Sequence, residues 1–235
     1  MINLANRSYK KEILDRNDIP FADIQQNMKE LNTINTLLGG HKITIAGIKA
    51  LAGQDHTNKP LTICEIGCGG GDNLKAIHQY CNNIHMPANF IGIDIKSECI
   101  EFAKKQYPGL PVNWITSDYK KTAFAGHKPD IIFSSLFCHH FSDAELNLML
   151  PWMKENATVG FFINDLHRHP IAYYSIKWIT KLFSGSYLVK NDAPLSVARG
   201  FKKAEWYNIL KKAGIGNFSI HWKWAFRYLI ICKND

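Results

Sequence analysis

From Leu61 onward, short apolar runs alternate with segments that have the spacing of amphipathic helices. Five runs are rich in β-branched and aromatic residues and predict strands: LTICEI, NFIGIDI, PVNWIT, PDIIFSS and TVGFFIND. Helical patterns lie between them, among them DNLKAIHQYC, SECIEFAKKQ and SDAELNLMLPWM. This alternation is typical of an α/β fold, in which a parallel sheet carries helices on both faces. Two final runs, NFSIHW and AFRYLIICK, are almost adjacent and predict an antiparallel hairpin that closes the sheet.

The first predicted strand leads into a glycine-rich turn, CEIGCGGGDN, at residues 64–73. A strand, a glycine turn and a helix N-terminus in succession usually receive a nucleotide. The dinucleotide fingerprint GxGxxG would need a glycine at position 72, where this chain has Asp72. The pattern is instead ExGxGxG, from Glu65 to Gly71. The flanking acids would repel a pyrophosphate but suit a cationic ligand, such as a sulfonium that carries an α-amino group.

Acidic residues also end the next two predicted strands. Asp94 ends IGIDI, where a carboxylate can accept hydrogen bonds from both ribose hydroxyls. Asp118, in ITSDY, ends the following strand and could accept a hydrogen bond from an adenine amino group. These acids beside a glycine turn predict a pocket for S-adenosylmethionine, with the glycines making room for its methionine moiety. The residues expected to bind this cofactor are Glu65, Gly67, Cys68, Gly69, Gly71, Asn73, Asp94, Ile95, Ser117, Asp118, Tyr119, Ser134 and Leu136.

These motifs resemble those of the class I S-adenosylmethionine-dependent methyltransferases. EIGCGGG matches the first motif, IGIDI the second, ITSDY the third and KPDIIFSSLFCHHF the fourth, in order within residues 60–235. The resemblance implies a Rossmann-like α/β fold: a mostly parallel seven-stranded sheet with an antiparallel last strand and helices on both faces. It also implies S-adenosylmethionine as cofactor and S-adenosylhomocysteine as product. The histidine pairs HH and HRH do not have a recognised metal-ligand spacing, so we expect no metal.

Other segments resemble a narrower group, the small O-methyltransferases found beside type III polyketide synthases, which act on phenolic lipids such as alkylresorcinols. These segments are INTLLGGH, LFCHHFSDAEL, NDLHRHP and PLSVARGF. The resemblance implies O-methylation of a small aromatic, phenolic or polyketide-derived acceptor in secondary metabolism. A looser resemblance to quinone C-methyltransferases keeps C-methylation of a quinone-like ring as an alternative.

A nucleic-acid substrate is the other alternative, because the net charge is +8. DNA and RNA amino-methyltransferases resemble one another in carrying [DNS]PP[YF] at the fourth strand, and this chain has SSLFCHH there, without the prolines. The lysines are scattered in pairs, with no block of five or six. RNA methylation or RNA binding is therefore an open but less favoured hypothesis.

The expected catalytic residues lie at the ends of the fourth and fifth predicted strands. A phenol has a pKa of about 10 and is mostly protonated at neutral pH, so a neighbouring base would help. The candidates are His139, His140, Asp165 and His167, and a His167–Asp165 dyad is one arrangement. Adjacent side chains of a strand point in opposite directions, so we expect only one of His139 and His140 to face the methyl group.

Residues 1–55 are expected to form an N-terminal helical cap, and residues 56–235 the methyltransferase domain. Apolar positions at helical spacing between residues 20 and 52 are interrupted at Gly39-Gly40. An aromatic-rich insertion follows the fifth strand at about 166–200, and we expect it to be a lid with its apolar face turned inward. A packed scaffold helix and a membrane-facing surface are the alternatives. The expected acceptor-binding residues are His41, Arg168, Tyr174, Trp178 and Arg199, although the two arginines could instead tie the lid down.

The expected location is the cytoplasm. The six cysteines show neither a CxxC pair nor a disulfide framework, which fits a reducing compartment. We see no secretory signal and no apolar run long enough to cross a membrane. The expected partner is a small hydrophobic aromatic acceptor; the sequence leaves open peripheral membrane contact and whether the chain is a monomer or a homodimer.

Overall fold

The computed structural model describes residues 3–16, 18–53, 59–124 and 126–234. Its strands are β1 (Leu61–Ile66), β2 (Ala88–Asp94), β3 (Val112–Thr116), β4 (Ile131–Ser135), β5 (Gly160–Leu166), β6 (Phe218–Lys223) and β7 (Arg227–Lys233). They form one sheet in the order β3-β2-β1-β4-β5-β7-β6. Strands β1 to β5 are parallel, and β7 runs antiparallel to both β5 and β6. The predicted fold class, including the reversed last strand, is confirmed.

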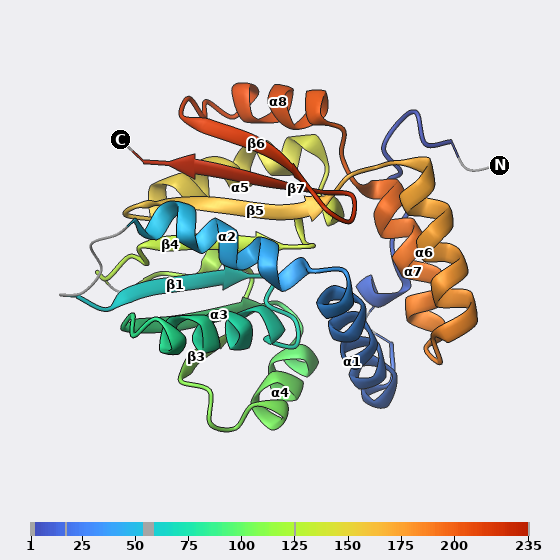
Figure 1. The fold of residues 1–235 in the computed structure, drawn as a ribbon, viewed down its shortest axis with the longest axis horizontal. Helices are drawn as coiled ribbons and strands as arrows, with labels where there is room; N and C mark the ends of the chain where they lie inside the picture. Colours follow the sequence, from blue (N-terminus) through green and yellow to red (C-terminus); the bar gives the residue numbers. More distant parts are fainter. Residues whose placement is uncertain (1–2, 17, 54–58, 125, 235) are drawn as a thin grey trace.

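The helices are α1 (Phe21–Leu37), α2 (Gly40–Ala52), α3 (Asp72–Asn83), α4 (Ser97–Gln106), α5 (Asp143–Asn156), α6 (Pro170–Phe183), α7 (Tyr187–Arg199) and α8 (Lys203–Lys212). Three short 3-10 turns are η1 (Ile13–Asp15), η2 (Tyr119–Lys121) and η3 (Cys138–His140). Helices α2 and α3 cover one face of the sheet, and α5 and α8 cover the other (Figure 1). Helices α1, α6 and α7 lie beyond the carboxyl ends of the parallel strands (Figure 1).

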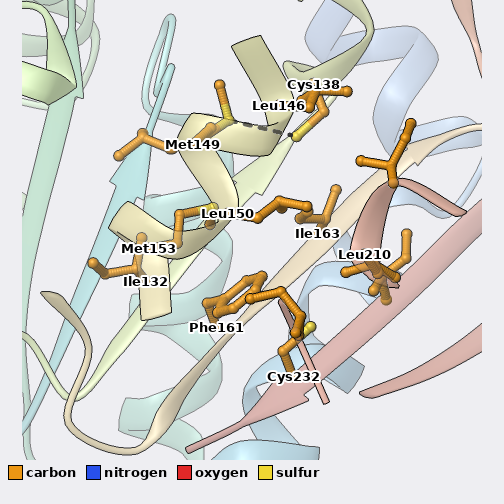
Figure 2. Close-up of a cluster of buried hydrophobic side chains, with 14 of the residues drawn as sticks. Ile132, Cys138, Leu146, Met149, Leu150, Met153, Phe161, Ile163, Leu210 and Cys232 are labelled. Atoms are coloured by element: carbon orange, nitrogen blue, oxygen red, sulfur yellow. Dashed lines mark hydrogen bonds between the residues drawn. The ribbon is translucent and has the colours of Figure 1, made fainter. Parts of the chain in front are cut away.

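The largest core cluster lies between the sheet and α5. Every residue of β4 is buried, as expected for a central parallel strand that is covered on both faces. Figure 2 shows the side chains of α5 against those of β4 and β5, with the Cys138 thiol in contact with Met149. The labelled residues of this cluster are Ile132, Cys138, Leu146, Met149, Leu150, Met153, Phe161, Ile163, Leu210 and Cys232. This packing fixes the strand ends from which the site is built.

The predicted break in the N-terminal helical region is confirmed. Gly39 has a φ of +73°, in the left-handed region that favours glycine, and it separates α1 from α2. A Cβ at Gly40 would lie 1.7 Å from the side-chain oxygen of Asn35, so only glycine fits there. The expected domain boundary at residues 55 and 56 lies outside the described residues. No helix in the described ranges is both long enough and apolar enough to cross a membrane.

Candidate active site

A pocket of about 1140 Å³ opens at the carboxyl ends of β1, β2 and β4. Its floor is made by the loops that follow these strands, and its cover by α1, η1, α6, α7 and the turn between β6 and β7. Open α/β sheets bind ligands at this place, where the strand order reverses. Residues of the N-terminal helical region and of the insertion after β5 both line this pocket.

The glycines in the turn after β1 are required mainly by the backbone conformation of the turn and by the side chains packed against it. Gly67, Gly69 and Gly71 all have a positive φ, between +50° and +78°. A Cβ at Gly67 would lie 2.2 Å from the ring of Phe137, and one at Gly71 would lie 2.4 Å from Trp114. Only Gly69 has open space, with its nearest neighbour at 3.6 Å. Packing inside the protein therefore requires glycine at both Gly67 and Gly71, and of these two only Gly67 also lines the pocket.

Glu65, at the end of β1, is a buried carboxylate at the wall of the pocket. Its Oε1 accepts a hydrogen bond from Asn73 Nδ2 at 2.9 Å. Its Oε2 has no hydrogen-bond partner among the described residues. Burial raises the pKa of Glu65 well above its ordinary value, and the negative charges of Asp72 and Asp94 raise it further. A cationic group in the pocket would satisfy the open oxygen and favour the charged form of Glu65.

Asp94, at the end of β2, lines the pocket and also braces the glycine turn. Its Oδ2 accepts the N–H of Gly69 at 2.9 Å, and its Oδ1 accepts the N–H of Lys96 at 2.9 Å. Asp118 caps η2 by accepting the N–H of Lys120 at 3.0 Å, and it also lines the pocket. All of the residues expected to bind cofactor line the pocket except Gly71 and Ser134. Ser134 is fully buried and contacts the Cys138 thiol instead.

His139 lies at the centre of a buried charged network. Its Nδ1 is 2.8 Å from Asp165 Oδ1, and its backbone N–H donates to Asp165 Oδ2 at 3.1 Å. Its Nε2 faces Glu12 Oε1 at 3.6 Å. Burial alone lowers the pKa of His139, but Asp165 and Glu12 outweigh it and raise the pKa to about 9. The ring therefore carries a proton at neutral pH and is an imidazolium rather than a free base.

Asp165 pairs with His139, so the predicted His167–Asp165 dyad is wrong. His167 points away from this network, and its Nδ1 accepts the indole N–H of Trp222 at 3.3 Å. Its ring also packs against Tyr228 at 4.9 Å. Neither Asp165 nor His167 lines the pocket. Asp165 is fully buried and can act on a ligand only through His139.

Glu12 is a site residue that sequence reasoning missed. It lies on the N-terminal segment, where Asp192 of α7 accepts the N–H groups of Ile13 and Leu14 at 2.8 and 2.9 Å. The Glu12 side chain is buried, lines the pocket and accepts a hydrogen bond from Ser196 at 2.7 Å. Burial raises its pKa, but the two histidines more than offset this and the net shift is downward. No motif in KKEILD signals this position.

His140 also lines the pocket and completes the cluster. Its Nδ1 is 3.1 Å from Asp15 Oδ1, and its Nε2 is 3.8 Å from Glu12 Oε2. Glu12, His139 and His140 each place one potential ligand atom within 4.8 Å of the others. Carboxylates already hold both Nδ1 atoms, so we assign no metal to the cluster.

Comparison with known families decides the protein's class. A family described as "Methyltransferase domain" matches residues 63–185, which is more than half of the chain. The chain belongs to this methyltransferase domain family. It is an enzyme, and S-adenosylmethionine is its methyl donor. No curated protein sequence matches the chain.

Solved structures with the same fold share little sequence with this methyltransferase. The plantazolicin methyltransferase BpumL, in complex with a monoazolic desmethylPZN analog and SAH, is 18% identical over 91% of this chain and 90% of its own, with a TM-score of 0.62. Human N-acetylserotonin methyltransferase with SAM is 14% identical over 92% of this chain and 56% of its own, with a TM-score of 0.64. Magnesium protoporphyrin IX methyltransferase from Synechocystis PCC 6803 with SAM is 15% identical over 87% and 84%, with a TM-score of 0.56. At these identities the likeness shows the fold alone.

The donor set fits S-adenosylmethionine, whose amino group and sulfonium are both cationic. The open Oε2 of Glu65 offers a buried acceptor to an ammonium group. Asp94 has acceptor capacity left on both oxygens after its backbone hydrogen bonds. His41, expected to contact the acceptor, instead lies behind this end of the pocket. Its Nδ1 is 3.0 Å from Asn73 Oδ1 and its Nε2 is 3.1 Å from Asn32 Oδ1, so it orients the Asn73 amide that bonds Glu65.

The two arginines tie down the cover, the second of the alternatives given by the sequence. Arg168 is buried outside the pocket, and its guanidinium donates to Glu205 at 2.6 Å and to the carbonyls of Leu4, Ala5 and Gly200. The expectation that it binds the acceptor is therefore wrong. Arg199 lines the pocket, but it donates to the carbonyls of the two active-site histidines and of Lys10. It holds the N-terminal segment against η3.

The inward-facing side of α6 is aliphatic rather than aromatic. Tyr174 and Trp178 are 45% and 58% exposed and do not line the pocket, so their predicted inward orientation is wrong. The residues of α6 that do line it are Ile171, Ala172, Ser175, Ile176 and Ile179. The turn between β6 and β7 adds Trp224 and Phe226, which sequence reasoning also missed. The hairpin itself was predicted from the sequence. Nothing in the sequence indicated that the turn between β6 and β7 lies over the pocket.

Proposed function

We propose that this methyltransferase methylates a hydroxyl group on a small, apolar aromatic acceptor of the phenolic or polyketide-derived type. One observation carries the proposal: a single pocket joins the Glu65 end of the sheet to the Glu12–His139–His140 cluster under an aliphatic cover. The first end suits a cationic donor and the second suits a hydroxyl group. Apolar side chains of α1 and α6 form part of the wall between them.

We assign the donor end to residues of the first three strand ends. Glu65 holds the amino group, Asp94 the ribose hydroxyls and Asp118 the adenine amino group. When bound, S-adenosylmethionine supplies a methyl group on a positively charged sulfur, which the acceptor oxygen takes by in-line displacement. The backbone of Leu136, with a φ of +53°, brings the end of β4 to the same part of the pocket. These residues act by orientation, which is the main contribution that a protein makes to such a transfer.

The acceptor end controls a proton. Glu12 Oε1 is a carboxylate oxygen in the pocket wall, and it can accept the proton of an acceptor hydroxyl while the new carbon–oxygen bond forms, because the oxygen becomes strongly acidic as it is methylated. His139 keeps its proton because Asp165 and Glu12 flank it, so its Nε2–H stabilises the ionised form of Glu12 until the transfer. Burial strengthens this stabilisation because little water screens it. His139 is thus proposed to act as an electrostatic group and Glu12 as the proton acceptor.

The cover supports an apolar acceptor. Side chains of α1 and α6 supply aliphatic carbon to one part of the pocket wall. The residues are Met28, Leu31, Ile34, Leu38, Ile171, Ile176 and Ile179. Such a wall also excludes water from the transfer. We further propose a cytoplasmic location, because all six cysteines are free and buried.

The test is a methyl-transfer screen with labelled S-adenosylmethionine. It sets alkylresorcinols, simple phenols and quinols against bulk RNA, with the methylated atom identified by mass spectrometry. Label on a phenolic oxygen, lost in Glu12→Gln, supports the proposal. Label on ring carbon shows that the quinone-type alternative is correct, and label only on RNA shows that the small-molecule assignment is wrong.

A further inference from the structure

Helix α6 carries an unusual amount of apolar surface on its outer side. The side chains of Ile171, Tyr174, Trp178, Leu182 and Phe183 are all exposed, with Leu182 and Phe183 at 69% and 82%; we call them the outer face of α6. The helix lies at one side of the molecule, with α7 as its main helical neighbour (Figure 1). A contiguous exposed apolar face of this kind marks an interaction surface.

The turn between β6 and β7 extends this surface. Phe226 stacks on His169, the N-cap residue of α6, with ring centroids 4.9 Å apart. Trp222 and Trp224 flank the same turn, and Trp224 is 70% exposed. Two tryptophans therefore stand beside an aromatic helix. Amphipathic aromatic rings of this kind are enriched where proteins meet the boundary between lipid and water.

Part of the rim of the pocket lies on this surface. Ile171, Ile179 and Trp224 are exposed and at the same time line the pocket. The apolar wall of the pocket thus continues onto the outside of α6 without a polar rim at these three residues. An acceptor that moved from an apolar phase into the pocket would stay in contact with carbon along this path.

The charged side chains that α6 itself carries are both lysines. The chain contains no Asp or Glu between residues 166 and 191, nor between residues 206 and 234. Lys177 and Lys181 flank the outer face of α6, with their Nζ atoms 6.0 and 5.3 Å from the ring centroids of Tyr173 and Trp178. Glu30 of α1 reaches the end of α6, where its carboxylate accepts hydrogen bonds from the N–H groups of Gly185 and Ser186.

We propose that the outer face of α6 and the β6–β7 turn dock on the surface of an anionic lipid bilayer. Aromatic and aliphatic side chains on one face with lysines beside them are the composition of helices that lie in the membrane interface. The lysines bind the lipid headgroups while their stems and the neighbouring rings enter the apolar boundary. A second copy of the chain fits less well, because the two faces would bring like charges together. Docking places this part of the pocket rim against the bilayer. That the acceptor enters from there rests on the proposed function, whereas docking itself does not.

The experiment is co-sedimentation of the full chain with vesicles, without any acceptor. Vesicles of phosphatidylcholine alone are compared with vesicles of equal parts phosphatidylcholine and phosphatidylglycerol. The wild type should bind the anionic vesicles more tightly than the neutral ones. Lys177→Glu with Lys181→Glu should weaken this binding by roughly 30-fold or more, since each lysine near an anionic surface contributes about a factor of five. Leu182→Ser with Phe183→Ser should weaken binding to both kinds of vesicle.

Matched controls come from exposed residues on other elements. Leu148→Ser on α5 removes a side chain that is as exposed as Leu182, and Lys211→Glu with Lys212→Glu on α8 makes the same charge change. These variants should lose less, because α8 lies on a different side of the molecule (Figure 1). Equal loss in both sets, or no vesicle binding by the wild type, overturns the proposal. So does a wild-type dimer in sedimentation that the α6 variants convert to a monomer.

Transfer to a detergent-dispersed phenol separates the two proposals. If vesicles are not bound but the phenol is methylated, the docking proposal falls and the proposed function stands. If vesicles are bound as expected but no phenolic compound is methylated, docking stands and the acceptor assignment falls.

Discussion

Glu65→Gln is the substitution that most directly tests the assignment of the donor end. The change keeps the shape of the side chain and leaves a carbonyl oxygen to accept the Asn73 hydrogen bond. It removes the negative charge and turns an N–H group toward the place where Glu65 Oε2 has no partner among the described residues. An ammonium group there would lose a charged acceptor and meet a donor instead.

The expected loss follows from the strength of a charged hydrogen bond. Such a bond contributes about 1.5–3 kcal/mol, so its loss corresponds to a roughly 10- to 150-fold higher dissociation constant for S-adenosylmethionine. Without cofactor the variant should behave differently. The pKa of Glu65 is raised in the folded protein, so its protonated side chain stabilises the fold fully at pH values below the ordinary pKa of 4.5. This stabilisation is lost as the pH rises through the folded-state pKa. Ligand-free Glu65→Gln lacks this loss, so it should be at least as stable as the wild type at pH 8.

Calorimetry measures the affinity, and thermal unfolding with and without S-adenosylmethionine measures the stability. The matched control is Asp130→Asn, which alters a carboxylate that accepts the N–H of Thr62 at 2.8 Å and the hydroxyl of Thr158 at 2.7 Å, before β4 and away from the pocket. It should lower the unfolding temperature and leave the affinity unchanged. A folded Glu65→Gln protein with wild-type affinity would refute the assignment.

Three further substitutions test other parts of the site. Asp94→Ala should weaken cofactor binding by about tenfold or more by calorimetry, because it removes a charged acceptor and the brace on Gly69; unchanged affinity in a folded protein would remove the ribose assignment. His139→Gln should lower kcat more than it raises KM. It should also flatten the loss of stability above pH 7: with a folded-state pKa of about 9, the stabilising charge of His139 is complete below pH 6.5 and is lost as the pH rises through 9. An unchanged dependence of stability on pH in the variant would contradict the network. Gly71→Ala should cost roughly 2 kcal/mol or more of unfolding free energy in denaturant titrations, because its φ is +78° and Trp114 occupies the Cβ position, whereas Gly109→Ala, with open space, should be nearly neutral.

The sheet and its cofactor end could be predicted from sequence because their signals are local. The central parallel strands β1, β4 and β5 are buried on both faces and therefore appear as nearly continuous apolar runs. The carboxyl ends of parallel strands meet at one edge, so Glu65, Asp94 and Asp118 could be placed together from their positions alone. The roles of Gly67 and Gly71 could not, because Phe137 and Trp114 reach them from elsewhere in the chain.

The acceptor end was predicted less well because its parts come from segments that are far apart in sequence. Glu12 meets His139 across more than a hundred residues, and only tertiary packing brings the N-terminal segment over the strand ends. The alternation rule for strands did not apply to the two histidines, because they lie in the 3-10 turn η3, where both side chains face the Glu12 carboxylate. The aromatic positions of α6 predicted an amphipathic helix correctly, but periodicity does not say which side of a helix meets the protein.

The active-site histidines and the cover are held by the same buried groups. Arg199 donates to both histidine carbonyls and to Lys10, and Asp192 holds the backbone that carries Glu12. A shift of the N-terminal segment would therefore remove Glu12 from His139 Nε2 and loosen η3 at the same time. Because His139 owes its raised pKa partly to Glu12, such a shift would also lower that pKa. The proton balance at the acceptor end and the closure of the pocket are thus linked through one segment, which has no recognisable motif in the sequence.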